Sequence, residues 1–249
     1  MKIVSTSISA SLLFGVASAI LGGDIVPSGT KTYVVGLRNS SSDSSFCAGA
    51  LISPTHVLTS PLCNKEGINY VSVGAHKVNG TDNGEVIKVK TVDIHPSYNP
   101  NDPWAWDFAI VTLENPSKFA PVKLASHDSD IQEGTLITMM GWGAPTWQGG
   151  DYSLELRNVT LEAWDTKNCI DVFTETFYPS QLCAGGVLNK GTVDGDWGGP
   201  LIKGNKEGDA DDVLLGTNTE GYGYGSDYPN VFSRVTTALS WIDSIVNSH

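Results

Sequence analysis

The chain has 249 residues, 40% of them hydrophobic, and carries a formal net charge of −12. This hydrophobic share excludes an intrinsically disordered protein, and the length suits one large or two small domains with a real core. The excess of 27 acidic over 15 basic residues argues against nucleic-acid binding, because phosphates would repel such a surface.

Residues 1–19 have the pattern of a secretory signal peptide. Lys2 supplies a positive start, Leu12–Val16 is apolar, and Ala17-Ser18-Ala19 has the small residues of a cleavage site. The apolar run is too short to span a bilayer, and no later run approaches that length. We therefore expect a secreted, extracellular protein whose single domain covers residues 20–249.

Short β-type runs dominate the mature chain, separated by clusters of Gly, Pro, Asn, Asp and Ser. This spacing is typical of an all-β barrel or sandwich. The expected strands cover residues 32–37, 49–52, 57–59, 70–73, 86–94, 108–112, 135–141, 154–161, 213–216 and 230–235. Only the C-terminal end has a helical pattern, with Val235, Leu239, Ile242 and Ile245 at helical spacing. A polar stretch near 121–134 is expected to separate two β-rich halves.

The four cysteines most simply form two disulfides in an exported protein. A zinc site is the alternative, but no close cysteine pair and no histidine at ligand spacing supports one. Of the three possible pairings, the neighbour pairing joins Cys47 to Cys63 and Cys169 to Cys183. Sequons at Asn39, Asn79 and Asn158 are candidates for glycosylation on the secretory route.

A series of motifs runs along the mature chain. They are Ile20-Leu21-Gly22-Gly23, Cys47-Ala48-Gly49-Ala50-Leu51-Ile52, the segment 57–63, the segment 107–113, Gly141-Trp142-Gly143, Leu182-Cys183-Ala184-Gly185, the segment 195–201 and the helix with Trp241. In this order and spacing they resemble the chymotrypsin/trypsin-like serine proteases. The resemblance implies an all-β fold of two packed antiparallel six-stranded β-barrels with a C-terminal helix.

The resemblance places the family's catalytic triad at Leu62, Asp107 and Trp197. Leucine stands where the family has its histidine, and tryptophan stands where it has its serine. Leucine cannot accept a proton, and an indole offers no nucleophilic oxygen. We therefore expect an inactive homologue with no catalytic residue, no cofactor and no metal. A hydrolase with relocated catalytic groups, such as Ser60 with one of the histidines, is the alternative.

The resemblance also implies a changed substrate pocket and a retained structural ion pair. Gly191 stands at the pocket base, Glu220 at its wall, and Asn230 where the family has a further glycine. In the family, the aspartate that corresponds to Asp196 binds the freed N-terminal ammonium. Here that ammonium would belong to Ile20. The scaffold is thus expected to persist without the reaction.

Aromatic residues lie in acidic loops around the expected cleft. Such residues are enriched at protein interfaces, although some are expected to pack in the core. The candidate partner-binding residues are Trp104, Trp106, Trp147, Tyr222, Tyr224 and Tyr228.

Among secreted, inactive trypsin-like proteins, the chain resembles the glucanase inhibitor proteins of plant-pathogenic oomycetes. That resemblance implies a virulence effector in the host apoplast that binds host endo-β-1,3-glucanase and limits the release of defence-triggering glucan fragments. It implies a protein partner, with no nucleic acid and no membrane. A carbohydrate-binding module, in which aromatic rings stack on sugars, is the alternative from another class.

Overall fold

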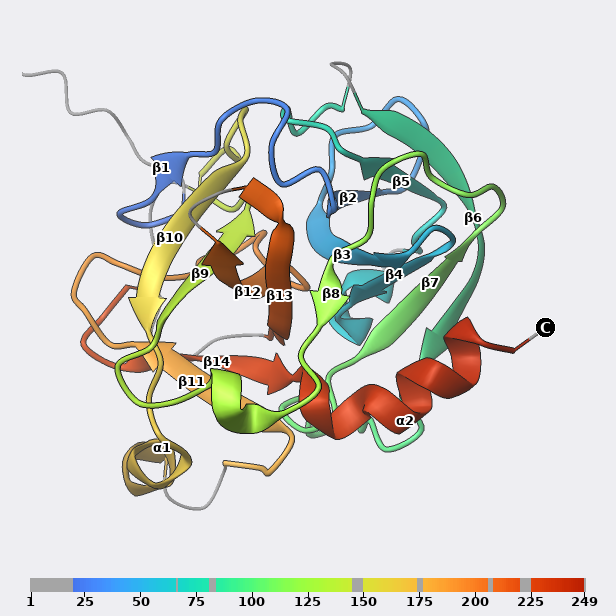
Figure 1. Cartoon of the computed structure of the whole chain (residues 1–249). Helices are drawn as coiled ribbons and strands as arrows, with labels where there is room; N and C mark the ends of the chain where they lie inside the picture. Colours follow the sequence, from blue (N-terminus) through green and yellow to red (C-terminus); the bar gives the residue numbers. More distant parts are fainter. Residues whose placement is uncertain are drawn as a thin grey trace, which may run out of the picture.

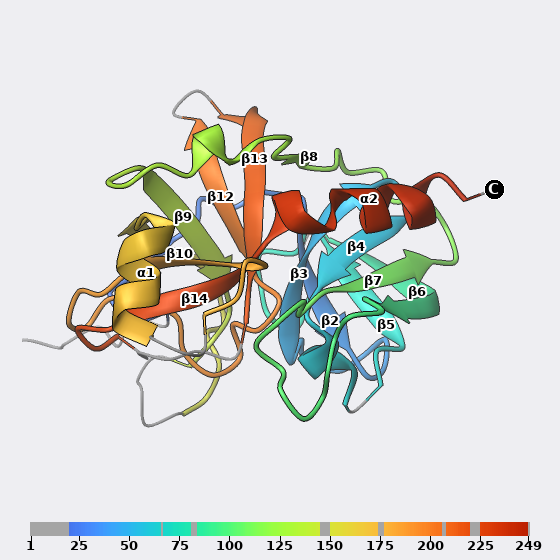
Figure 2. The same cartoon turned by 90° about the horizontal axis from the view of Figure 1, so that it is seen from below.

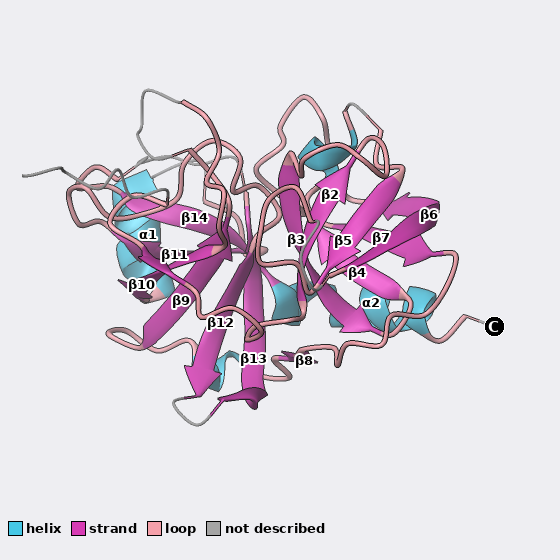
Figure 3. Cartoon of the chain, turned by 90° about the horizontal axis from the view of Figure 1, so that it is seen from above, coloured by secondary structure: helices cyan, strands magenta, loops and turns pink. Residues whose placement is uncertain are grey.

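Two β-structures lie side by side in the protein (Figures 1 and 3). The structure is a computed structural model, and it describes residues 20–65, 67–80, 84–144, 150–173, 177–205, 208–219 and 225–248. The first is a closed barrel in the order β2-β3-β4-β7-β6-β5, with all neighbours antiparallel. Its strands are β2 (Val34–Arg38), β3 (Cys47–Ser53), β4 (His56–Thr59), β5 (Tyr70–Val73), β6 (Glu85–Ile94) and β7 (Ala109–Leu113). The 3-10 helix η1 (Pro61–Asn64) follows β4.

The second structure is an 8-stranded sheet in the order β1-β10-β9-β12-β13-β14-β11, with β8 paired to β13. Its strands are β1 (Asp24–Ile25), β8 (Lys123–Leu124), β9 (Leu136–Gly141), β10 (Arg157–Glu162), β11 (Gln181–Gly185), β12 (Pro200–Asn205), β13 (Gly208–Asn218) and β14 (Pro229–Arg234). The sheet curves until Ala163, just beyond β10, bridges to Ala184 in β11. The trypsin-like fold is therefore confirmed, although the short strands β1 and β8 make this half larger than the expected six strands.

Each strand predicted from the sequence overlaps an observed one, and four strands were missed. Strands β1 and β8 are only two residues long, and β8 lies inside the stretch 121–134 that was expected to be a connection. Strand β12 begins with Pro200 and contains Gly204, which weakens its strand pattern. Strand β11 is buried throughout, so its residues show no alternation of polar and apolar side chains.

The C-terminal helix α2 (Val235–Val246) is confirmed, but the expectation that it is the only helix is wrong. A second helix, α1 (Thr166–Phe173), buries only Cys169 and so presents no apolar stripe to a sequence search. The Asp165 carboxylate accepts the Asn168 N–H at 2.7 Å, and this N-terminal cap helps to start α1. Among the described residues, no helix is long and apolar enough to cross a membrane.

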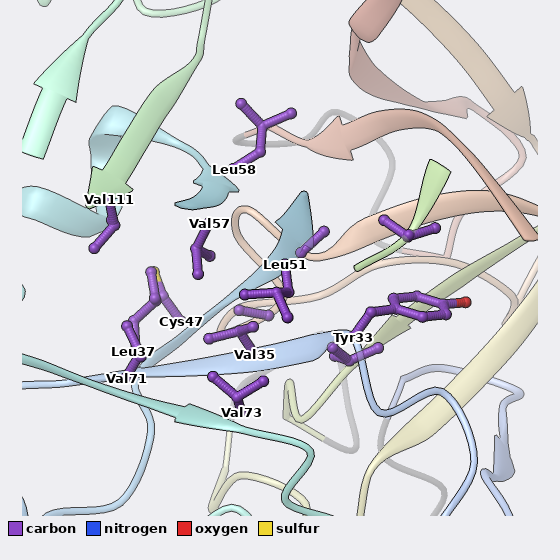
Figure 4. Close-up of a cluster of buried hydrophobic side chains, with 14 of the residues drawn as sticks. Tyr33, Val35, Leu37, Cys47, Leu51, Val57, Leu58, Val71, Val73 and Val111 are labelled. Carbon is purple, nitrogen blue, oxygen red and sulfur yellow. The ribbon is translucent and has the colours of Figure 1, made fainter. Parts of the chain in front are cut away.

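The closed barrel is filled by branched aliphatic side chains that point inward from neighbouring strands (Figure 4). Val35 and Leu37 of β2 lie beside Leu51 of β3 and Val71 of β5, all fully buried. Helix α2 follows β14 in the chain, yet it contributes Val235, Ala238 and Ile242 to the same cluster. Figure 2 shows α2 lying along the closed barrel, so the C-terminus fastens the two halves together.

Two disulfides are present, as the cysteine count predicts. Cys47 of β3 is joined to Cys63 of η1, and Cys169 of α1 is joined to Cys183 of β11. Each closes a short loop, and a bridge of this size contributes about 3 kcal/mol by restricting the unfolded chain. The first bridge holds η1 against the barrel, and the second holds α1 against the sheet.

A buried carboxylate also links the two halves. Asp212 of β13 accepts the Tyr33 hydroxyl and the Lys31 ammonium, each at 2.6 Å. Figure 4 shows the Tyr33 hydroxyl pointing out of the barrel cluster, the direction from which this contact is made. Burial and the Asp212 carboxylate raise the pKa of Tyr33 well above its ordinary value, so this hydroxyl stays a donor.

We expect Asp212→Ala to lower the free energy of unfolding by about 3–5 kcal/mol, because it leaves the Tyr33 hydroxyl without its buried acceptor and Lys31 with only the partly exposed Asp209. Asp211→Ala is the matched control, since its side chain is 68% exposed and it pairs with Lys123 at the surface. Urea unfolding monitored by tryptophan fluorescence measures both variants. Equal losses for the two variants would contradict a role for Asp212 in fastening the halves.

Candidate functional site

The three positions assigned to the triad come from three elements at the junction of the two halves. Leu62 lies in η1, Asp107 precedes β7, and Trp197 lies in the turn before β12. The Trp197 carbonyl accepts the Ala48 N–H of β3 at 3.0 Å, and the Gly198 N–H donates to Asn218 of β13 at 2.8 Å. The loop that carries Trp197 is therefore anchored to both halves.

Leu62 and Trp197 line one groove with a volume of about 400 Å³. Its other lining residues are Phe46, Cys47, Cys63, Lys65 and Tyr152. Among the described residues of this lining, Lys65 is the only charged one, and none carries a carboxylate or an imidazole. The groove thus offers apolar and aromatic contact surface, but no base and no activated nucleophile.

Asp107 has a structural contact in place of a catalytic one. Its carboxylate is fully buried and accepts the Ser60 hydroxyl at 2.6 Å. The Ser60 oxygen in turn accepts the Leu62 N–H at 3.1 Å, which caps η1. Asp107 therefore orients the helix that forms one wall of the groove, and Ser60 is fully buried between these partners.

The described histidines lie outside the groove. The His56 Nδ1 contacts the Ser53 hydroxyl at 2.8 Å within the β3–β4 turn, and the His76 Nε2 contacts Glu155 at 3.1 Å. His95 stacks on Trp106, and His127 is exposed before the short helix at residues 128–130. Among the described residues, no serine, histidine and carboxylate meet at the groove, so nothing supports a relocated triad there.

The expected substrate pocket is filled at its base. The Asn230 amide oxygen of β14 lies 2.3 Å from the position that a Cβ on Gly191 would take, and it accepts the Thr192 N–H at 3.3 Å. Asn230 is only 1% exposed. Glu220, expected at the pocket wall, lies outside the described residues.

Tyr152 packs against a second position that the resemblance assigns to the catalytic centre. In Ser-His-Asp hydrolases, the backbone N–H of the nucleophile and that of the residue two before it bind the oxyanion. The second of these positions is Gly195, and a Tyr152 ring carbon lies 2.6 Å from where a Gly195 Cβ would stand. The sequence places Tyr152 in an aromatic loop, but it was not assigned to the site because no local motif marks it. Phe46 and Lys65 were also missed, although both lie within two residues of a motif cysteine.

Asp196 is fully buried behind this loop. Its carboxylate accepts the Gly143 N–H at 2.8 Å and the Val193 N–H at 3.1 Å. Burial is the main cause that raises its pKa to about 7. Ile20 is also fully buried, in the cluster that contains Ile137. The ion pair between the Ile20 ammonium and Asp196 remains a prediction for the chain cleaved after Ala19.

The candidate partner-binding aromatics occupy different surroundings. Trp106 stacks on His95 with 4.8 Å between ring centroids, so part of its surface is used in packing. Trp104 is half-buried, and its carbonyl accepts the Gln181 amide at 2.7 Å. Tyr228 is 56% exposed. The remaining three candidates, Trp147, Tyr222 and Tyr224, lie outside the described residues.

The sequon asparagines also differ in access. Asn79 is exposed in a turn that the Gly80 N–H closes by donating to the Lys77 carbonyl at 2.7 Å. Asn39 is half-buried and its side-chain oxygen is enclosed. Asn158 lies in β10, between β1 and β9. Asn79 is therefore the best placed of the three predicted glycosylation sites.

Comparisons with known proteins agree with this architecture. The family model for trypsin matches residues 20–242. The chain is 45% identical to glucanase inhibitor protein 2 of Phytophthora sojae, over 100% of this chain and 89% of the relative. It is 46% identical to glucanase inhibitor protein 2 of Phytophthora infestans, over 98% of both. It is also 32% identical to trypsin 5G1 of Aedes aegypti, over 91% of this chain and 84% of the relative.

The buried Asp196 predicts a pH dependence that cleavage of the leader would remove. In the uncleaved chain, the folded-state pKa of about 7 lies above the ordinary value of 3.8. The stability contributed by this group is then present below pH 3.8 and is lost as the pH rises toward 7. In the chain that begins at Ile20, the new ammonium would compensate the buried charge.

Urea unfolding of chains 1–249 and 20–249 between pH 4 and pH 7 tests this prediction. Relative to its own Asp196→Asn variant, the uncleaved chain should lose unfolding free energy across this window. The chain that begins at Ile20 should not. Identical slopes for both chains would show that Ile20 does not pair with Asp196.

Proposed function

The chain belongs to the trypsin family, and we propose that it is a non-catalytic member that binds and inhibits a host plant endo-β-1,3-glucanase. The observation that carries the proposal is the groove at the former catalytic centre. Leucine and tryptophan replace the base and the nucleophile there, and their side chains line a surface for binding. Loss of the nucleophile or the base alone costs on the order of 10⁶ in turnover.

The groove is pre-formed. The Cys47–Cys63 disulfide and the Asp107–Ser60–Leu62 contacts hold its η1 wall, and backbone bonds to both halves hold Trp197. Rigid surfaces bind with little loss of conformational entropy. The relatives named as glucanase inhibitor proteins supply the class of partner. Because the lining offers no group for transfer, inhibition is non-covalent and acts by blocking the glucan-binding cleft.

The proposal places the protein outside the cell. The signal-like residues 1–19, the two disulfides and the sequons are typical of a secreted chain. In the host apoplast, such an inhibitor acts as a virulence factor. It protects the pathogen's wall glucan and suppresses the release of glucan fragments that trigger defence.

We expect the chain 20–249 to inhibit β-1,3-glucan hydrolysis by at least one apoplastic endo-β-1,3-glucanase, with one-to-one saturation. Trp197→Ala should weaken inhibition at least tenfold, because a central aromatic anchor is worth about 2 kcal/mol or more. Val86→Ala, a partly exposed residue of β6, is the control. No inhibition and no co-precipitation across a panel of glucanases would reject the proposal. Glucan binding without any enzyme would favour a carbohydrate-binding module instead.

We expect Leu62→His with Trp197→Ser to restore at most weak peptidase activity, because Asn230 fills the pocket base and Tyr152 covers Gly195. Adding Asn230→Gly and Tyr152→Gly to this double variant should raise the rate further. Hydrolysis of a panel of fluorogenic peptides measures both variants. Robust turnover by the unmodified chain, or full activity of the double variant, would contradict this account of its inactivity.

A further inference from the structure

A second surface lies away from the groove, where the β11–β14 pair ends. The last paired residues are Gly185 of β11 and Pro229 of β14, and beyond this pair the two segments of the chain continue as neighbouring loops (Figure 1). Val187 is 55% exposed, Leu188 is 69% exposed and Tyr228 is 56% exposed. We call these three side chains the apolar turn patch. Single exposed apolar residues are ordinary, but three on adjoining loops form a candidate contact surface.

Backbone hydrogen bonds hold the turn that carries this patch. The Lys190 N–H donates to the Val187 carbonyl at 3.0 Å, which closes the turn. The Asn189 N–H donates to the Gly225 carbonyl, and the Gly191 N–H donates to the Leu21 carbonyl at 3.1 Å. The turn is thus fastened to the opposite loop and to the N-terminal segment. An apolar tip held in this way loses little freedom on binding.

Charge distinguishes the two ends of the patch. At one end, the Lys190 side chain makes no ion pair or hydrogen bond within the described part of the chain. At the other end, the exposed Asp227 adjoins Tyr228. The half-buried Lys190 thus places a positive charge beside the apolar residues of a protein whose net charge is −12.

We propose that the apolar turn patch enters the substrate cleft of the glucanase, with Leu188 on the apolar floor and the Lys190 ammonium facing the catalytic carboxylates. The inference rests on the proposed function. Glycoside hydrolases commonly carry a pair of catalytic carboxylates beside the scissile bond, and ligand clefts are concave and largely apolar or aromatic. An exposed apolar turn beside a lysine complements both features, whereas the groove at Trp197 is concave and must receive a projection of the partner.

Two pairs of variants of the chain 20–249 test this placement by inhibition of β-1,3-glucan hydrolysis. Leu188→Ser should weaken inhibition at least tenfold, whereas Leu136→Ser, 62% exposed on β9, should change it less than twofold. Lys190→Glu should weaken inhibition at least tenfold and most strongly at low salt, because it places like charges together. Lys90→Glu, exposed on β6, is the control for net charge. Asp227→Asn should not weaken inhibition.

The outcomes separate this inference from the proposed function. If the unmodified chain inhibits no glucanase, the proposed function fails and the inference fails with it. If it inhibits and both patch variants inhibit equally well, only the inference is overturned. Sedimentation velocity tests a second copy as the occupant. Dimers of the unmodified chain that Leu188→Ser abolishes, with unchanged inhibition, would overturn the glucanase placement.

Discussion

One buried carboxylate sets the path of the loop at the centre of this protein. Asp196 is fully buried, and the backbones of Gly141 and Gly143 pack closely against its carboxylate. A Cβ on either glycine would come within 2.5 Å of a carboxylate oxygen of Asp196. In the described structure, the backbone N–H groups of Gly143 and Val193 donate hydrogen bonds to this carboxylate. A charge buried this deeply is costly unless it is paired, and the predicted ammonium of Ile20 would supply that partner in the cleaved chain. The positions of Gly195 and Trp197 follow from this constraint.

The differences from a trypsin-like catalytic site extend beyond the two triad positions that carry leucine and tryptophan. Asp107 keeps its place because Ser60 needs a buried acceptor, and Ser60 caps the helix that carries Leu62. Asn230 occupies the base of the substrate pocket, and Tyr152 lies over Gly195. Asp107 and Ser60 support the apolar groove, whereas Asn230 and Tyr152 occupy space that a hydrolase of this family needs. These four residues belong to different parts of the fold. This agreement argues for a binding surface rather than for a damaged enzyme.

The sequence predicted the fold well because the motifs combine local pattern with long-range order. Alternation and turn residues marked the longer strands, and the spacing of Val235 and Ile242 marked α2. Strands β1 and β8 were not predicted because two residues are too few to show a hydrophobic periodicity. Helix α1 was not predicted because its stability comes from the Asp165 cap and a disulfide. These elements depend on contacts made by distant parts of the chain.

The site was predicted where a motif names the residue, and missed where only packing defines it. Leu62, Asp107 and Trp197 lie within motifs, so their substitutions were visible in the sequence. Tyr152 reaches Gly195 across the fold, and no spacing rule connects the two. The stacking of Trp106 on His95 was equally hidden, because a loop tryptophan in an acidic segment has the same pattern whether it packs or projects.

Under the proposed function, a trypsin scaffold would suit an inhibitor because its binding surfaces are held rigidly. The groove is concave and held by a disulfide, whereas the apolar turn patch is exposed and held by backbone bonds. If a partner cleft receives the turn as proposed, the rim of that cleft would contact the groove, and the two surfaces would complement different features of one enzyme. The net charge of −12 accelerates association with a basic partner over long range, and this effect is screened by salt. The apolar contacts act only at short range and determine how long the complex lasts. The association rate and the lifetime of such a complex would therefore depend on different parts of the molecule.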